Sequence, residues 1–185
     1  MRRVAAGFLL LLLPACGAAR GAVAIPSDEI PFSLARSPQA DQLQAVPQAQ
    51  YSLAFVRRGH LVDVTRQLST RLPQESVMIA LLDGPTPRET DRGITTEIPS
   101  ETRLLQVSVV DGVAAVNLSR EFQTAGSNES VLLRVADVVR TLTSTKGVSS
   151  VHFLIDGESV GVPTDSGVVE RPVGAADYAS VRPAA

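Results

Sequence analysis

The sequence predicts an α+β fold: a two-layer sandwich in which two helices cover one face of a mostly antiparallel sheet, in the order ββαββαββ. Three observations predict it. Short stretches of alternating apolar and polar residues, typical of half-buried strands, occur in pairs separated by glycine-containing turns. Two longer, helix-like apolar stretches separate these pairs. The domain, residues 50–162, is long enough for one modest core but not for two domains.

The first pair of strands is predicted within residues 51–68. In "YSLAFV" the side chains alternate, so that Tyr51, Leu53 and Phe55 share one face. "RRGH" follows as a glycine-containing turn, and "LVDVTRQL" returns as the second strand. These stretches together predict a β-hairpin.

The first helix is predicted from Pro73, which can occupy the first position of a helix. The stretch "QESVMIALL" is too densely apolar for a solvent-facing helix, and we expect its apolar residues to be largely buried: Val77, Ile79, Leu81 and Leu82. Gly84 supplies a left-handed stop, with a proline directly behind it. Residues 85–101 are polar, charged and rich in proline, and are predicted to form the longest loop.

The second pair of strands surrounds Asp111-Gly112, a dipeptide that favours the type I′ turn of a hairpin because both of its residues tolerate positive φ. The strand before it, "RLLQVSVV", is predicted to place Leu105, Val107 and Val109 on one face. The chain returns as "VAAVNL".

The second helix has the clearest sequence signals. Ser127 is a suitable N-cap, and Glu129 in the first turn is favoured by the helix dipole. Apolar residues recur at three- and four-residue spacing and predict one apolar face: Val131, Leu132, Val135, Val138, Val139 and Leu142. Lys146 and Gly147 end the helix. A last strand, "SVHFLI", follows, and Asp156-Gly157 turns it toward a short returning segment.

The first 15 residues predict a lipoprotein signal peptide. Arg2 and Arg3 precede an apolar run that is too short to span a bilayer, and "LPAC" resembles a bacterial lipobox. Cys16 is the single cysteine, so it has no disulfide partner, and it lies far in sequence from either histidine. We expect two acyl chains on Cys16 to anchor the protein at the extracytoplasmic face of the cell membrane. Ordinary secretion with cleavage nearby is the alternative.

Two segments flank the predicted domain. Residues 16–49 are rich in Pro, Ala, Ser and Gln without apolar periodicity, and predict an extended tether between the membrane and the domain. Residues 163–185 show little pattern and are expected to be a C-terminal tail laid partly along the domain.

Composition excludes some partners. The chain has 17 basic and 19 acidic residues, for a formal net charge of −2, and it has no basic run. A mildly acidic chain of this kind lacks the positive surface that nucleic-acid binding requires.

One motif resembles a catalytic site. "GESVG" at 157–161 matches the nucleophile elbow of α/β-hydrolases, with Ser159 as the nucleophile. The elbow requires a helix directly after the serine, whereas "VPTDSG" cannot begin a long helix. The hydrolase order also places the histidine after the serine, and both His60 and His152 precede it. We therefore expect a turn residue and no enzymatic activity.

Metal and cofactor sites are not predicted. His60 lies in a turn, His152 lies on the outer face of a strand, and neither has a cysteine nearby. Several carboxylates in the long loop do not have EF-hand spacing: Asp83, Glu89, Asp91, Glu97 and Glu101. Phosphate-binding and dinucleotide-binding glycine motifs are missing from the sequence.

Four arginines are candidates for contacting a partner. Arg57 and Arg58 form a cationic pair at the tip of the first hairpin, and Arg88 and Arg92 lie in the long loop. These side chains can contact lipid headgroups, an anionic cell-wall polymer or a partner protein. The alternative is that the arginines only keep exposed turns soluble.

Several stretches together resemble a GerMN domain: "ALLDGP" at 80–85, "EIPSETRLLQVSVVDGVAAVNLSREF" at 97–122, and "VVRTLTSTKGVSSVHFLIDG" at 138–157. The GerMN module is known from sporulation and spore-germination lipoproteins and from actinobacterial envelope lipoproteins, and the resemblance suggests an actinobacterial member. It implies a membrane-tethered, extracytoplasmic module without established catalytic residues, similar in fold to the ring-building motifs of envelope machines.

The sequence is therefore compatible with two functions. The first is a non-catalytic interaction module that docks on an envelope protein in an envelope or sporulation-type assembly. The second is a protein that binds a small ligand or the glycan of the cell wall.

Overall fold

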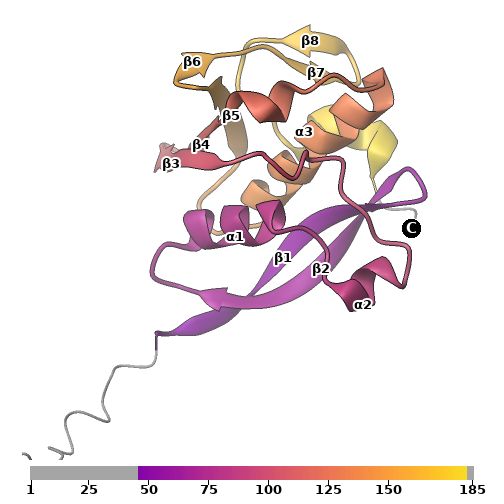
Figure 1. Ribbon diagram of the computed structural model, residues 1–185. Coiled ribbons are helices and arrows are strands. Elements are labelled where there is room, and N and C mark those ends of the chain that lie inside the picture. Colours follow the sequence, from indigo (N-terminus) through magenta and orange to yellow (C-terminus); the bar gives the residue numbers. More distant parts are fainter. Residues whose placement is uncertain (1–45, 183–185) are drawn as a thin grey trace, which may run out of the picture. The chain divides into compact units, whose positions relative to one another are not determined.

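The computed structural model describes residues 46–182 (Figure 1). The predicted signal peptide, Cys16 and nearly all of the predicted tether lie outside the described residues. The strands are β1 (Gln48–Arg57), β2 (His60–Ser69), β3 (Leu104–Val110), β4 (Val113–Leu118), β5 (Ser150–Ile155), β6 (Glu158–Ser159), β7 (Val162–Thr164) and β8 (Gly167–Val169). The helices are α1 (Pro73–Leu82), α2 (Pro87–Thr90) and α3 (Asn128–Thr143), with 3₁₀ helices η1 (Arg120–Gln123) and η2 (Ala175–Val181).

Strands β1 and β2 form an antiparallel hairpin of their own, paired from Gln48–Ser69 at its open end to Arg57–His60 at its turn. The predicted face of Leu53 and Phe55 is fully buried. Residues 54 and 56, on the opposite face, are also buried, because the ribbon is covered on both sides near its turn. The hairpin is therefore part of the core and not an edge of the main sheet.

The main sheet has four strands in the order β3-β4-β5-β6. Strands β3 and β4 are antiparallel, β4 and β5 are parallel across α3, and β5 and β6 are antiparallel. Burial alternates along β4 and β5, so one face of the sheet packs on the helices and the other is open. The prediction that Leu105 lies on the buried face of β3 is wrong, since Leu105 is 49% exposed. A bulge between Leu104 and Gln106 shifts the register there.

Helix α1 is buried on most sides, as its apolar density predicts. Val77, Met78 and Leu81 are fully buried. Gly84 has a left-handed φ of 78°, which ends the helical conformation. The prediction was wrong for Ile79, which is 48% exposed on the side of the helix turned away from the core.

Helix α3 lies at the centre of the domain and contacts β1, β2, α1, β5, β7 and η2. Ser127 caps it as predicted, accepting a hydrogen bond of 3.1 Å from the Ser130 N–H. Every residue from 133 to 139 is buried, including Arg134 and Asp137. The helix therefore has more than the single apolar face that its periodicity predicts.

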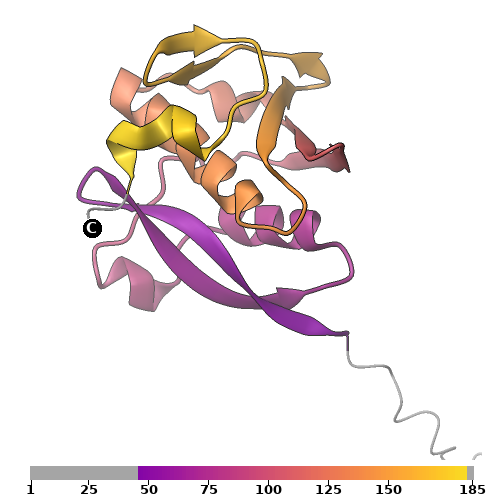
Figure 2. The same cartoon turned by 180° about the vertical axis from the view of Figure 1, so that it is seen from behind.

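Helices α1 and α3 lie between the β1–β2 hairpin and the four-stranded sheet (Figures 1 and 2). The mixed α+β class with mostly antiparallel pairing is confirmed. The two-layer expectation differs from the structure, in which the first hairpin packs on the side of the helices away from the main sheet. Helices that are apolar on most sides need a second covering layer, and the hairpin supplies it.

The segment expected to be a tail is folded onto the domain. Strands β7 and β8 form a small antiparallel hairpin that contacts α3, and η2 packs on the same helix. Val173 bridges to Val151 of β5 with backbone hydrogen bonds of 2.8 and 2.9 Å, and Tyr178 and Val181 are buried. These strands are only three residues long, so they carry too little periodicity to be recognised in the sequence.

Candidate binding site

Three of the four candidate arginines lie together. Arg57, Arg58 and Arg92 line a pocket of about 610 Å³ at the turn of the β1–β2 hairpin, and none of them forms an ion pair with another described residue. The other lining residues are His60, Leu61, Val62 and Asp63. Arg88, in α2, does not line this pocket. We call this feature the arginine pocket.

Arg58 occupies an unusual backbone conformation. It and Gly59 have φ of 55° and 76°, both positive, as a type I′ turn requires. The turns at Asp111 and Asp156 also have positive φ, and both use the Asp-Gly dipeptide that this turn favours. An arginine at positive φ costs roughly 1–2 kcal/mol and has no short side chain to hydrogen-bond locally. Local turn preference therefore does not explain Arg58.

Arg92 is held near the hairpin by an ordered loop. Val56 and Thr95 exchange two backbone hydrogen bonds of 2.9 and 2.8 Å, which fix the loop against the strand one residue before Arg57. Upstream, Glu89 accepts a hydrogen bond from the Thr86 N–H at 2.7 Å and pairs with Arg66 of β2 at 2.5 Å. The segment predicted to be a loop thus contains a capped single-turn helix, which an ion pair connects to the hairpin.

The Glu89 carboxyl contributes to this order. Its burial alone would raise the pKa, but hydrogen bonds from Thr86 and Arg66 lower the pKa of Glu89 below its ordinary value. Glu89 is therefore charged and paired at neutral pH, and it does not act as a free acid.

One carboxylate lines the arginine pocket, but another residue neutralises it. Asp63 accepts hydrogen bonds from Nε and Nη2 of Arg140 in α3 at 2.7 and 2.5 Å. The pair carries no net charge, so the three arginines leave the pocket positive. A group that complements it carries negative charge in a planar or tetrahedral arrangement of oxygens, such as a carboxylate or a phosphate.

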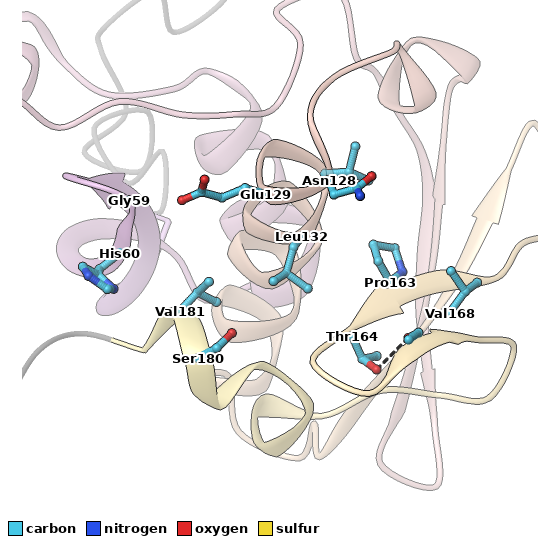
Figure 3. Close-up of a pocket in the computed structure, with 12 residues that line it drawn as sticks. Gly59, His60, Asn128, Glu129, Leu132, Pro163, Thr164, Val168, Ser180 and Val181 are labelled. Atoms are coloured by element: carbon cyan, nitrogen blue, oxygen red, sulfur yellow. Dashed lines mark hydrogen bonds between the residues drawn. The ribbon is translucent and has the colours of Figure 1, made fainter.

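A second pocket, of about 710 Å³, shares the lining residue His60 with the first. It lies between the hairpin turn, the first turns of α3, the β7–β8 hairpin and η2 (Figure 3). Its apolar wall consists of Val131, Leu132, Pro163, Val168 and Val181. Its polar side chains are those of His60, Asn128, Glu129, Thr164 and Ser180. We call it the apolar pocket; pockets of this size and character hold small ligands in many proteins.

Ser159 and His152 lie closer together than their order in the sequence suggests. The Ser159 hydroxyl is 3.0 Å from Nε2 of His152, across strands β5 and β6. The serine is exposed in a short strand, not at a strand-to-helix elbow, and no described carboxylate hydrogen-bonds to the histidine. Nucleophilic catalysis uses a base that a third group orients, and among the described residues no carboxylate orients His152.

The acidic residues of the long loop do not converge. Glu89 pairs with Arg66, and Glu97 accepts a hydrogen bond of 2.5 Å from Ser130 of α3. Within residues 46–182, no three histidine, cysteine or carboxylate side chains gather as they would around a metal ion. In the same part of the chain, no helix is long and apolar enough to cross a membrane.

The sequence did not identify two features. One is the apolar pocket, whose walls come from segments with no recognisable pattern. The other is the burial of two polar residues in α3, Arg134 and Asp137. Arg134 donates to the carbonyls of Glu97, Phe122 and Thr124 at 2.8, 2.6 and 3.0 Å, whereas Asp137 has no described hydrogen-bond partner. The two residues interrupt the apolar periodicity of the helix, and this interruption is the one signal of them in the local sequence.

Comparison with known families agrees with the resemblance seen in the sequence. The family named Germane, described as "Sporulation and spore germination", matches residues 40–161, which is most of the chain. The chain belongs to the Germane family. No curated protein sequence matches it.

Three solved structures are similar to this chain in fold. The first GerMN domain of the sporulation protein GerM from Bacillus subtilis is 19% identical, with a TM-score of 0.56, and the match covers 70% of this chain and 99% of that one. A Clostridium perfringens protein described as a lipoprotein is 18% identical, with a TM-score of 0.52, over 75% of this chain and 95% of that one. The tandem GerMN domains of GerM are 20% identical, with a TM-score of 0.51, over 69% of this chain and 45% of that one.

Proposed function

We propose that this Germane-family protein is a lipid-anchored, extracytoplasmic interaction module with no catalytic role, which docks on an envelope protein in a sporulation-type or related envelope assembly. The arginine pocket is the observation that carries the proposal, because three cations from two distant segments meet in a chain of net negative charge. The family description and the lipoprotein and sporulation-protein structures with the same fold support the proposed setting.

The membrane anchor rests on Cys16. The lipobox-like "LPAC" and the apolar run before it support acylation at this residue. Cells that express the chain and are fed a labelled fatty acid should incorporate the label into this protein and retain it in the membrane fraction. Cys16→Ser should remove both the label and the membrane retention; a Cys16→Ser protein that is still labelled would overturn the anchor.

The docking surface is tested by cross-linking the lipidated protein in intact cells and identifying the attached molecules by mass spectrometry. We expect one dominant envelope protein at near-equal amount. A triple variant, Arg57→Gln, Arg58→Asn and Arg92→Gln, should lose this partner, whereas Arg88→Gln, outside the pocket, should keep it. A partner retained by the triple variant would show that docking uses another surface.

The apolar pocket favours a second function, the binding of a small ligand or of a cell-wall fragment. Its volume of about 710 Å³ lies within the range of small-molecule sites. Saturable binding of purified peptidoglycan fragments would support the cell-wall version. If these fragments show no binding at millimolar concentration, the cell-wall version is wrong.

A further inference from the structure

We propose that the arginine pocket and the apolar pocket form one continuous site for an amphiphile with a phosphate head group and an apolar chain. This inference rests on the second proposed function, the binding of a small ligand, and specifies the class of that ligand. The phosphate would lie among Arg57, Arg58 and Arg92, and the chain would lie along the wall formed by α3 and the β7–β8 hairpin.

Both pockets are lined by residues of the hairpin turn. His60 lines both of them, and Gly59, which precedes it, lines the apolar pocket. Figure 3 shows these two residues on the opposite side of the apolar pocket from Pro163 and Val168. A ligand that extends from one pocket into the other therefore passes the turn itself.

The distribution of charge fixes the orientation of the ligand. In the arginine pocket, the carboxylate of Asp63 is already paired with Arg140, so the arginines are free to bind an anion. In the apolar pocket, Glu129 lies against the turn, with its Oε1 3.4 Å from where a Cβ at position 59 would be. A phosphate placed there would be repelled by Glu129, so the head group belongs in the arginine pocket.

The head group is better matched by phosphate than by a neutral polar group. Arginine forks bind phosphate oxygens through paired, charge-assisted hydrogen bonds, and three of them suit a group with several charged oxygens. The unfavourable backbone conformation of Arg58 fits the same interpretation. A residue kept at positive φ against its local preference is explained when its side chain has a ligand to bind.

The apolar wall is suited to the apolar chain of the ligand. Val168 of β8 is 74% exposed, although large apolar side chains gain free energy when they are covered. Leu132 and Val131 of α3 and Pro163 of β7 continue the same surface. An alkyl or prenyl chain would cover these side chains without requiring a hydrogen-bonding partner in the ligand.

The test uses the mature chain with Cys16→Ser, so that no acyl group of the protein competes for the apolar pocket. Calorimetric titration compares octyl phosphate with inorganic phosphate, octanol and octyltrimethylammonium, all as monomers. We expect octyl phosphate to bind at least about tenfold more tightly than each of the other three, because it alone fills both pockets. Equal affinity for octyl phosphate and octyltrimethylammonium, or for octyl phosphate and inorganic phosphate, would overturn the proposal.

Variants assign the two ends of the ligand. Arg92→Gln should weaken octyl phosphate binding by about tenfold, and Val168→Asp should weaken it similarly by placing a charge in the apolar wall. Arg88→Gln is the matched control and should bind normally. Unchanged binding in both of the first two variants would overturn the site.

Two further results distinguish this inference from docking on a membrane surface and from docking on a protein. Binding to phosphatidylglycerol vesicles without binding of monomeric octyl phosphate would overturn the site in favour of docking on a membrane surface. A cross-linked partner that is lost in the arginine triple variant, in a protein that does not bind octyl phosphate, would overturn the inference and leave the proposed protein docking intact.

Discussion

The carboxylate of Asp63 in β2 accepts two hydrogen bonds, of 2.7 and 2.5 Å, from the guanidinium of Arg140 in α3, although the two residues are 77 positions apart. The pair joins the first hairpin to the central helix. These hydrogen bonds raise the pKa of the Arg140 guanidinium above its ordinary value. The pair also cancels the single negative charge in the wall of the arginine pocket, so stability and binding are linked at this contact.

Removal of either partner should separate the effect of this pair on stability from its effect on binding. The pair is partly exposed, so Arg140→Gln and Asp63→Asn should each lower the free energy of unfolding by no more than about 1 kcal/mol in urea denaturation. Arg140→Gln leaves a free carboxylate beside the arginines and should weaken octyl phosphate binding. Asp63→Asn should bind at least as well as wild type. Equal binding by the two variants would mean that Asp63 does not affect the pocket.

Arg58→Asn should make the protein more stable and less able to bind. Asparagine adopts positive φ more easily than arginine, so the turn should gain about 1 kcal/mol in the free energy of unfolding. The loss of one guanidinium should weaken anion binding. Thermal unfolding and calorimetry on the same samples measure both, with Arg57→Gln as a control in which stability stays constant because Arg57 lies in ordinary strand conformation. A destabilised Arg58→Asn protein would contradict this account of the turn.

Thr141→Val should weaken the docking of α3 on the hairpin. The buried Thr141 hydroxyl accepts a hydrogen bond of 2.9 Å from the Ala54 N–H, and valine has nearly the same shape but cannot accept it. An unsatisfied buried N–H costs about 1–3 kcal/mol, which chemical denaturation can measure. Thr141→Ser keeps the hydroxyl and should cost about 1 kcal/mol for the lost methyl group. A serine variant less stable than the valine variant would show that the hydroxyl contributes little.

Asp137→Leu should stabilise the protein at neutral pH. Asp137 is fully buried in α3, and both of its carboxylate oxygens have no hydrogen-bond partner among the described residues. Replacing such a group with an apolar one of similar size should raise the free energy of unfolding by about 1–3 kcal/mol. Urea denaturation at pH 7 measures the change. A less stable Asp137→Leu protein would indicate that the carboxyl has a partner in solution.

The same residue should make stability depend on pH. Burial, and secondarily the negative charge of Glu97, raise the pKa of the Asp137 carboxyl well above its ordinary value of 3.8. The folded protein therefore favours the protonated acid, whose contribution is fully present below pH 3.8 and is lost as the pH rises through the raised pKa. Asp137→Asn cannot ionise, so the stability of wild type relative to this variant should fall as the pH is raised from 4 to 8. A difference that does not change with pH would contradict the raised pKa.

Ser159 should not act as a nucleophile. Its hydrogen bond to His152 is exposed, and no described carboxylate orients the histidine as a catalytic base requires. We expect hydrolysis of p-nitrophenyl acetate by wild type and by Ser159→Ala at the same rate. A clearly slower Ser159→Ala protein would show that this pair is catalytic.

Several local features of the fold can be predicted from the sequence. Asp111-Gly112 and Asp156-Gly157 predict turns, and both pairs have the positive φ that this requires. Ser127 predicts the start of α3, and its side chain caps the helix. Alternation predicts β5, where burial follows it residue by residue. Such features depend on backbone preference and on which face of one element is apolar, and neighbouring residues carry both signals.

The way in which these elements combine depends on long-range packing. This packing placed the first hairpin across the helices from the main sheet, and it brought Arg92 to the turn of Arg57 and Arg58 while leaving Arg88 outside. It also buried Arg134 where three backbone carbonyls converge, a place that no stretch of sequence marks. Long-range pairing depends on the shape and hydrogen-bonding needs of surfaces that form only when distant segments pack together, so local periodicity could not reveal the two pockets.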